Sequence, residues 1–305
     1  MTLAQKHSRL IRNFGLLTQE PMRKYTTFRV GGPADLLALP HTGRELRDLI
    51  QSARARHLPI TIVGGGSNLL VSDQGIRGLT IVLKNLRSSI LIKGDTCLET
   101  SAGESLARVV NFAMTRGLSG LEFAAGIPGT LGGAVIMNAG TADNWMSHVL
   151  ESVDFLDLET LELKILKKRD MEFSYRKLNF SGGVIVTVRL ELERDTPETI
   201  RNRFEMNLKN KNKTQPVSQA SAGCFFKNPG PDQSAGKLID QAGLKGMRVN
   251  DAQVSDRHAN FIINRGNASC KDILALESMV REKVWEKFNI RLEAEVKVVG
   301  DGKED

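Results

Sequence analysis

The most unusual stretch of this sequence is Gly126-Ile-Pro-Gly-Thr-Leu-Gly-Gly-Ala-Val-Ile-Met-Asn138-Ala-Gly140, which places five glycines among fifteen mostly apolar residues. Glycine has no side chain, so its backbone can approach a flat or charged ligand closely. The amide of Asn138 could satisfy ligand heteroatoms in a pocket lined by Ile127, Leu131 and Val135. We therefore predict that this stretch contacts a cofactor. A glycine-rich packing segment between sheets is the alternative interpretation.

A second glycine loop, Gly64-Gly-Gly-Ser-Asn68, follows the short apolar segment Ile60-Thr-Ile-Val63. A turn of small residues directly after a buried strand exposes backbone N–H groups that can bind phosphate oxygens. The loop is not a Rossmann fingerprint, because Leu69 stands in the place of the third glycine, and it lacks the Gly-Lys-Ser/Thr ending of a P-loop. Two such loops predict one extended cofactor, and a plain tight turn is the alternative for this pentapeptide.

Capping residues followed by apolar spacing predict five helices. These helices begin at or just after Thr42, Ser101, Thr196, Ser234 and Ser269. In the first two, a glutamate follows the cap by three residues, at Glu45 and Glu104, and the second helix has a natural stop at Gly117.

Apolar residues that alternate along the chain predict strands in its middle and at its end. The segments 153–158 and 161–165 flank a tight turn at Glu159-Thr160, 184–192 alternates strictly, and 291–299 is the last strand. Together with the helices, this pattern indicates an α+β fold with a domain boundary near residue 200.

The composition is that of a globular protein: 305 residues, 41% hydrophobic and 25% charged, enough for two or three cooperating units. No run approaches the roughly 18 consecutive apolar residues that a membrane span needs, and residues 1–10 lack the apolar core of a signal peptide. We therefore expect a cytoplasmic protein with no membrane partner. The three cysteines form no C-x-x-C pair and the five histidines show no ligand spacing, so neither disulfides nor a metal site are expected.

The net charge of +7 favours polyanionic ligands, whether nucleic acids or phosphorylated small molecules. The densest basic segment, 201–213, has a spacing that also suits the solvated face of a helix, and we prefer that interpretation. A nucleic-acid-binding protein is a rival hypothesis, but the chain has only two Trp and two Tyr to interleave with basic residues. We expect no nucleic-acid partner.

Eight blocks of this sequence resemble the UDP-N-acetylenolpyruvoylglucosamine reductase family, whose FAD domain is of the vanillyl-alcohol-oxidase type. The blocks are Thr26–Ala34, Val63–Leu70, Gly126–Gly140, Phe173–Arg176, Ser221–Pro229, Ala235–Gly246, Val254–Asn260 and Leu292–Lys297. One such block is a weak signal, but eight in the family's order and at its spacing are highly specific.

The resemblance implies a fold and a reaction. The fold is α+β, with a two-part FAD-binding domain of the vanillyl-alcohol-oxidase (PCMH) type, residues 1–85 and 86–200, followed by a smaller α+β substrate-binding domain, residues 201–305. The reaction is the NADPH-dependent reduction of UDP-N-acetylglucosamine enolpyruvate to UDP-N-acetylmuramate through non-covalent FAD, in peptidoglycan precursor synthesis. The implied partners are the UDP-sugar and NADPH, and we expect a monomer. Another FAD-dependent oxidoreductase on the same scaffold is the alternative.

The resemblance also implies which residues bind the cofactor. Gly64 to Asn68 would surround the FAD pyrophosphate, and Gly126 to Asn138 would lie near the rest of the molecule. The implied cofactor-binding residues are Thr26, Arg29, Gly64, Gly65, Gly66, Ser67, Asn68, Gly126, Pro128, Gly129, Gly132, Gly133 and Asn138.

For the substrate, the chain is similar to the shorter subtype of the family, because only Lys177 to Gly182 separate Arg176 from the next strand. The residues implied to bind the sugar nucleotide are Tyr175, Lys213, Asn228 and Gln241, with Lys211 as a further candidate for the diphosphate. An ordinary half-buried tyrosine is the alternative for Tyr175.

Three residues are implied to be catalytic. Arg176 and Glu295 would stabilise the enolate that forms when hydride adds to C3, with Glu295 protonated or hydrogen-bonded to the enol. The pattern alone would make them a surface arginine and a solvated glutamate. Cys224 stands where the family usually has the serine that protonates C2, and a thiol gives up its proton more readily than an alcohol. A small buried hydrophobe is the alternative for Cys224.

Overall fold

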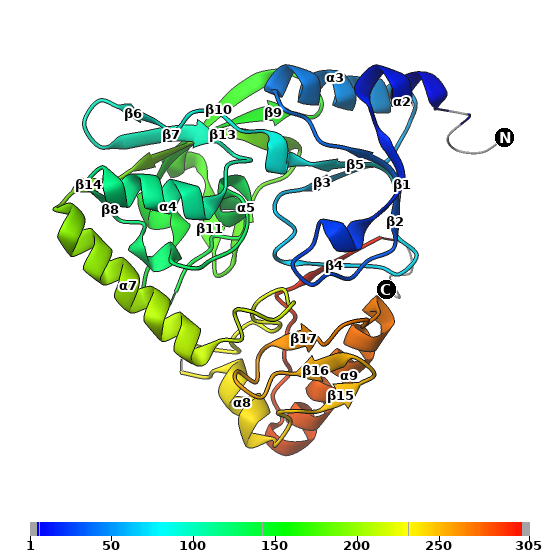
Figure 1. The fold of residues 1–305 in the computed structure, drawn as a ribbon, viewed down its shortest axis with the longest axis vertical. Helices are drawn as coiled ribbons and strands as arrows, with labels where there is room; N and C mark the ends of the chain where they lie inside the picture. The colour runs from blue at the N-terminus through cyan, green and yellow to red at the C-terminus, as the bar shows by residue number, and fades with distance from the viewer. Residues whose placement is uncertain (1–4, 6, 142, 231, 301–305) are drawn as a thin grey trace. The chain divides into compact units, whose positions relative to one another are not determined.

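The computed structural model describes residues 5, 7–141, 143–230 and 232–300 (Figure 1). The chain forms two compact units, each built from segments that are far apart in the sequence. Unit 1 comprises residues 1–16, 37–65 and 79–210, and unit 2 comprises residues 17–36, 66–78 and 211–305. The implied division into residues 1–85, 86–200 and 201–305 stays a prediction. The helix α7 (Pro197–Thr214) runs across residue 200.

The centre of unit 1 is a five-stranded antiparallel sheet in the order β10-β9-β13-β7-β6. Its strands are β6 (Leu91–Lys93), β7 (Cys97–Ser101), β9 (Leu150–Asp157), β10 (Leu163–Lys167) and β13 (Gly183–Glu191). The helices α4 (Leu106–Thr115) and α5 (Leu131–Ile136) contribute buried side chains to the same core as this sheet. That core holds the amino end of α5, and with it the glycine stretch, in a fixed place.

The other elements of unit 1 are shorter or lie at its surface. They are α2 (Ser8–Phe14), α3 (Gly43–Arg54), α6 (Met146–Val149), β3 (Ile60–Val63), β8 (Leu118–Ser119), β11 (Glu172–Ser174), β12 (Lys177–Asn179), β14 (Glu193–Arg194) and most of α7. β3 pairs in parallel with the last residues of β5 (Ile76–Val82), so the loop after β3 begins at a strand end.

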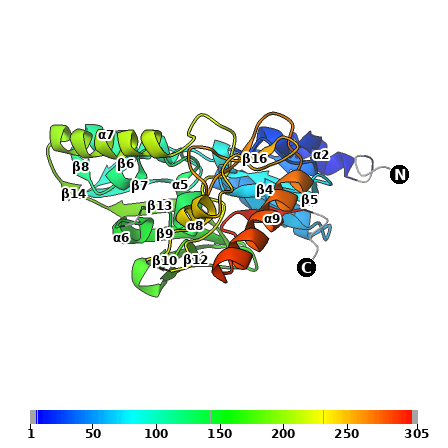
Figure 2. The same ribbon diagram turned by 90° about the horizontal axis from the view of Figure 1, so that it is seen from below.

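Unit 2 has a core of its own, in which Phe28, Phe225 and Phe226 meet apolar residues of α9. Its elements are β1 (Leu17–Pro21), the start of β2 (Pro33–Ala38), β4 (Leu69–Val71), α8 (Ala235–Gln241), β15 (Arg248–Val249), β16 (Ala252–Val254), β17 (Ile262–Asn264), α9 (Cys270–Phe288) and β18 (Lys297–Val299). β15, β16 and β17 form an antiparallel sheet on which α9 packs (Figure 1), and Figure 2 shows α9 from below. β18 pairs in parallel with β4, and this pairing ties the end of the chain to the loop that follows Gly66. No helix in the described ranges combines the length and the apolar character that crossing a membrane requires.

Most of the predicted elements are confirmed, and the mixed helix and strand content of both units confirms the α+β class. The helix after Thr42 is α3, and the Thr42 hydroxyl accepts a hydrogen bond from the backbone N–H of Glu45 at 3.1 Å. The strand 60–63 is β3, and the segments 153–158 and 161–165 form the β9–β10 hairpin. The remaining confirmed helices are α7, α8 and α9.

The predicted start of the second helix is wrong. Ser101 ends β7, and its hydroxyl donates to the carbonyl of Leu86 at 2.7 Å instead of capping a helix. α4 begins only at Leu106, and the Glu104 carboxylate accepts from the backbone N–H of Ser105 at 2.8 Å. The Ser-x-x-Glu pattern is present, but pairing with the neighbouring strand β13 decides the conformation of Ser101.

The last predicted strand is too long, since β18 covers only Lys297–Val299. The residues before it, from Glu293 to Glu295, bond to the irregular segment from Phe225 to Lys227, with one isolated bridge between Phe226 and Ala294. Their alternating pattern therefore belongs to a local pairing outside any named sheet.

Candidate functional site

The two glycine loops predicted to bind a cofactor pack directly against each other in unit 1. A Cβ atom on Gly64 would lie 2.8 Å from Oγ1 of Thr130, and one on Gly65 would lie 2.6 Å from Cα of Gly129. Thr130 is the N-cap of α5, where its hydroxyl accepts from Gly133 N at 3.4 Å. A side chain at either of the first two positions would push the loops apart, so this contact explains why they are glycines.

A different contact and the backbone conformation account for other glycines of the long stretch. A Cβ on Gly132 would lie 2.7 Å from the Cβ of Ala102, and Gly132 N donates to the Ala102 carbonyl at 2.8 Å. Gly126 and Gly129 have φ of +67° and +116°, in the left-handed region that favours glycine. Gly126 and Pro128 are exposed. Sequence reasoning missed Thr130 as a site residue, although a threonine directly before Leu-Gly-Gly carries an N-cap signal.

The loop after β3 keeps several backbone donors available. Across the described ranges, the N–H groups of Gly65, Gly66 and Ser67 donate no hydrogen bond to the protein. Gly66 has φ of +64°, and a Cβ on it would lie 1.9 Å from the carbonyl of Tyr25. Consecutive N–H groups in such a turn form a concavity suited to an anion, and a pyrophosphate has the matching acceptors.

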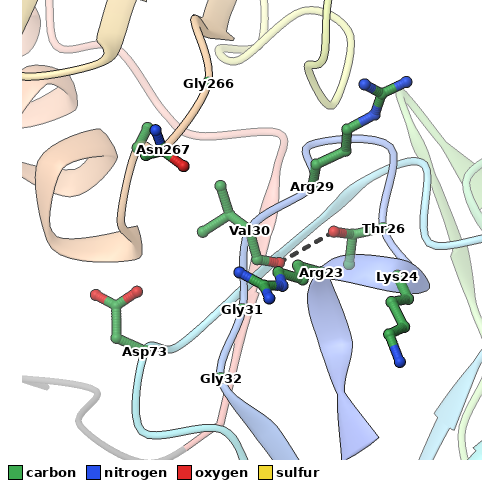
Figure 3. A pocket seen from close by; sticks show the side chains of 11 residues that line it. Arg23, Lys24, Thr26, Arg29, Val30, Gly31, Gly32, Asp73, Gly266 and Asn267 are labelled. Carbon is green, nitrogen blue, oxygen red and sulfur yellow. Dashed lines mark hydrogen bonds between the residues drawn. The ribbon is translucent and has the colours of Figure 1, made fainter.

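Thr26 and Arg29 lie together beside a pocket of about 630 Å³ in unit 2 (Figure 3). Thr26 is buried and its hydroxyl donates to the Val30 carbonyl at 3.0 Å, whereas Arg29 is exposed and has a φ of +56°. Figure 3 shows Asp73 across the pocket from Arg29. The Asp73 carboxylate accepts two backbone N–H groups at the start of α9, from Cys270 at 2.8 Å and from the next residue at 3.0 Å.

Asn138 is buried directly after α5 with a φ of +40°, and both ends of its amide bond to backbone. Its Nδ2 donates to the carbonyl of Ser174 at 3.2 Å, and its Oδ1 accepts from Ser147 N at 3.0 Å. A contact between this amide and a ligand stays a prediction. In the structure, the Asn138 amide binds the backbone of Ser174, the residue before Tyr175.

Arg176 and Tyr175 form the tip of the β11–β12 hairpin, and Arg176 adopts a φ of +58° there. The Arg176 guanidinium donates to the carbonyl of Gly140 at 2.7 Å and lies 5.3 Å from the centre of the Tyr175 ring, which is 44% exposed. Two hydrogen bonds, from Asn138 to Ser174 and from Arg176 to Gly140, join the hairpin to the end of the glycine stretch. The structure therefore places the predicted catalytic arginine beside that stretch.

Cys224 and Glu295 lie on two neighbouring segments of unit 2, and both are half-buried. Glu295 N donates to the carbonyl of Phe225 at 2.8 Å, so the segment that follows Cys224 runs alongside Glu295. The side chain of Asn68 donates to the Glu295 carbonyl at 3.1 Å, and Lys297 N donates to the Asn68 carbonyl at 3.1 Å. The last residue of the glycine loop is thus bonded to Glu295, and Glu295 is bonded to the residue that follows Cys224.

The predicted substrate residues Lys213, Asn228 and Gln241 are all exposed in unit 2. Asn228 Oδ1 accepts from the backbone N–H of Ala235 at the start of α8, at 3.1 Å. Lys213 lies in the last turn of α7 and Gln241 in the last turn of α8. No hydrogen bond among the described residues joins these three side chains, so their common role stays a prediction.

The other two cysteines are held as thiols. Burial, together with the nearby Glu151 carboxylate, raises the pKa of Cys97 to about 12. Burial and the Asp73 carboxylate raise the pKa of Cys270 to about 12. Neither environment suits a thiol that must lose its proton near neutrality.

Comparisons with known proteins agree with these features. Residues 215–299 match the family model described as UDP-N-acetylenolpyruvoylglucosamine reductase, C-terminal domain, and residues 34–160 match the FAD binding domain model. Together with the solved neighbour described below, these matches confirm the predicted α+β fold with an FAD-binding part before a smaller C-terminal domain.

Individual relatives are similar along nearly the whole chain. The UDP-N-acetylenolpyruvoylglucosamine reductase of Desulfosudis oleivorans is 44% identical over 92% of this chain and 93% of its own length. The protein of the same name from Moorella thermoacetica is 46% identical, with 94% of both chains covered. The crystal structure of UDP-N-acetylenolpyruvylglucosamine reductase from Thermus caldophilus has a TM-score of 0.79 and 39% identity, covering 91% of this chain and 97% of that one. The resemblance carried by the eight blocks is therefore confirmed, and the chain belongs to the UDP-N-acetylenolpyruvoylglucosamine reductase family.

Proposed function

We propose that this chain reduces UDP-N-acetylglucosamine enolpyruvate to UDP-N-acetylmuramate, with FAD as bound cofactor and NADPH as the source of hydride. The observation that carries the proposal is similarity along the whole chain to reductases of this name, at 44% and 46% identity in the two relatives above. UDP-N-acetylmuramate is a peptidoglycan precursor, and the proposed reaction would take place in the cytoplasm.

The residues of both glycine loops fit FAD. The N–H groups of Gly65, Gly66 and Ser67 offer donors for a pyrophosphate, and the close packing of Gly65 on Gly129 leaves no side chain in the way. Gly126 to Gly133 would hold the rest of the cofactor with their backbone. When bound, FAD accepts hydride from NADPH and supplies it to the substrate, chemistry that no amino-acid side chain provides.

Arg176 is proposed to stabilise the negative charge that develops beside the substrate carboxylate. Its guanidinium is planar and matches a carboxylate or enolate in shape, and its bond to the Gly140 carbonyl supports its orientation. The loss of one comparable donor typically lowers the rate by about two to three orders of magnitude. Tyr175, which stacks near this guanidinium, would contact the substrate from the same hairpin tip.

Cys224 is proposed to donate the proton to C2, and Glu295 to assist in stabilising the enol. Both lie on segments whose backbone is fixed by hydrogen bonds in unit 2. In the same unit, Lys213 offers an exposed ammonium group for the diphosphate. Asn228 and Gln241 are proposed to bind polar groups of the sugar nucleotide.

An anaerobic spectroscopic titration tests this function. The purified protein should be yellow, lose its flavin absorbance on addition of NADPH, and regain it on addition of the enolpyruvyl sugar nucleotide. If the absorbance returns only with oxygen, the chain is another flavoprotein on the same scaffold. If the protein binds no flavin and instead binds oligonucleotides in a salt-sensitive way, the nucleic-acid alternative is correct.

A further inference from the structure

Asn260 is a buried residue, 3% exposed, whose polar atoms are directed at the two residues that follow Cys224. Its backbone carbonyl accepts from Phe225 N at 2.7 Å. Its side-chain Oδ1 accepts from Phe226 N at 2.9 Å, and its Nδ2 donates to the Phe226 carbonyl at 2.8 Å. Three hydrogen bonds from one residue thus hold the backbone of two consecutive residues, Phe225 and Phe226.

In this arrangement the side chain of Asn260 makes the pair of hydrogen bonds that the backbone of a neighbouring β-strand would make. A carboxamide presents a donor and an acceptor side by side, as the backbone of a neighbouring strand does. On the opposite edge, Lys227 N donates to the Glu293 carbonyl at 2.8 Å and Glu295 N donates to the Phe225 carbonyl at 2.8 Å. The segment Phe225–Lys227 is therefore bonded on both edges although it belongs to no named sheet.

Cys224 lies directly before this anchored segment. Gly223 has a φ of +83°, and a Cβ on it would meet no atom within 4 Å. The preceding fixed point is Ser221, whose carbonyl accepts from the Thr27 hydroxyl at 2.7 Å. Between this point and the anchored segment, Ala222 is buried in the core of unit 2, and the bonds that Asn260 makes fix the backbone directly after the thiol.

The neighbour of Asn260 supports its conformation. Asn260 N donates to Nδ1 of His258 at 3.3 Å, and the ring of His258 packs on the ring of Phe261 with centres 5.0 Å apart. Burial, with a contribution from the charge of Lys245, lowers the pKa of His258, so this ring nitrogen stays an acceptor near neutral pH.

We propose that Asn260 is a positioning residue, which clamps the backbone after Cys224 so that the thiol meets C2 of the substrate. The inference rests on the proposed function. In the step it supports, the S–H bond of Cys224 breaks and a C2–H bond forms. The electron pair stays on sulfur as a thiolate, so the charge of the enolate moves to the sulfur, and solvent returns the proton afterwards.

The test uses the variants Asn260→Ala and Asn260→Ser, with Gln253→Ala as matched control. Gln253 is another buried carboxamide in unit 2, 7% exposed. Its Nε2 donates to the carboxylate of Asp256 at 3.1 Å and not to the segment after Cys224. Stopped-flow absorbance would follow flavin reduction by NADPH and flavin reoxidation by the enolpyruvyl sugar nucleotide separately. The solvent deuterium isotope effect would be measured on the second reaction.

Asn260→Ala should slow reoxidation by about 10- to 100-fold, because misplacing a reacting group by about 1 Å costs on that order. Asn260→Ser, which can replace only one of the two side-chain bonds, should lie between Asn260→Ala and the wild type. Flavin reduction should change by less than about twofold in both, and the solvent isotope effect on reoxidation should rise as proton transfer becomes limiting. Gln253→Ala should leave both reactions unchanged.

Wild-type reoxidation rates in both Asn260 variants would overturn the inference. An equal slowing of flavin reduction and flavin reoxidation would also overturn it, because such a result indicates a merely structural role for Asn260. A wild type that is reduced but never reoxidised by the substrate contradicts the proposed function itself. If neither variant folds, amide hydrogen exchange in the wild type decides: Phe225 and Phe226 amides should exchange as slowly as those of β17, and fast exchange contradicts the clamp.

Discussion

Cys224 is held unequally on its two sides, and this bears on how it would donate a proton. Gly223 before it has room around it, whereas Phe225 after it is hydrogen-bonded on both edges. The other two thiols lie near carboxylates, Cys97 half-buried and Cys270 buried, and the pKa of each is raised to about 12. Neither is therefore suited to release a proton near neutral pH, and the role of Cys224 stays a proposal.

We predict that Cys224→Ser retains substantial turnover and that Cys224→Ala does not. A serine hydroxyl can occupy the same place and donate a proton, and an alanine methyl cannot. Flavin reduction by NADPH should remain in both variants, because that step needs no proton from residue 224. Stopped-flow measurement of the two half-reactions checks this. Rapid substrate reduction by the alanine variant would remove Cys224 from the mechanism.

For individual residues, the sequence indicated which side chains are candidates for the site but not the hydrogen bonds that position them. The Phe-Ser-Tyr-Arg block pointed to Arg176, yet its bond to Gly140 joins residues that only the folded chain brings together. Asn138 was predicted to face a ligand, while its amide bonds to Ser174 and Ser147. Asn260 ends one of the eight family blocks, but no local pattern indicated its role, because its partners lie in a segment that is remote in the sequence.

The elements proposed to lie nearest the cofactor are the two glycine loops, which contact each other at Gly65 and Gly129. This contact lets us predict how a substitution at Gly65 affects FAD binding. Gly65→Ala should weaken FAD binding by about 5- to 150-fold, since the new Cβ would lie 2.6 Å from Cα of Gly129 and overpacking of this kind costs about 1–3 kcal/mol. The matched control is Gly43→Ala in the first turn of α3, where a Cβ meets no atom within 4 Å.

Flavin retained after dialysis, read as the ratio of flavin to protein absorbance, measures this effect. Gly43→Ala should retain FAD as the wild type does. Equal retention by Gly65→Ala would mean that the loop contact does not shape the cofactor site.

The sequence predicted individual elements well where local signals were strong. The Thr42 cap and the strand 60–63 are found as expected, because each depends on residues a few positions apart. The Ser101 pattern failed because pairing of β7 with β13 determines that segment. The strand 291–299 was overlong because an irregular partner, Phe225–Lys227, can satisfy alternating residues as well as a sheet does.

At the scale of the whole molecule, the α+β class could be predicted, and the interleaving of the two units could not. β4 pairs with β18, which lies near the other end of the sequence. Phe28, in the first part of the chain, lies in the same core as Phe225. Periodicity and capping describe neighbours along the chain, so contacts of this kind leave no local trace. The eight family blocks indicated the overall fold because they span the chain.

We propose above all that this chain transfers reducing equivalents from NADPH to the enolpyruvyl double bond of a UDP-sugar. Mass spectrometry of the sugar nucleotide after anaerobic incubation with NADPH and the purified flavoprotein tests it most directly. We predict a product heavier than the substrate by two hydrogens, formed in proportion to the NADPH consumed. NADPH consumption with the sugar nucleotide left unchanged would contradict it.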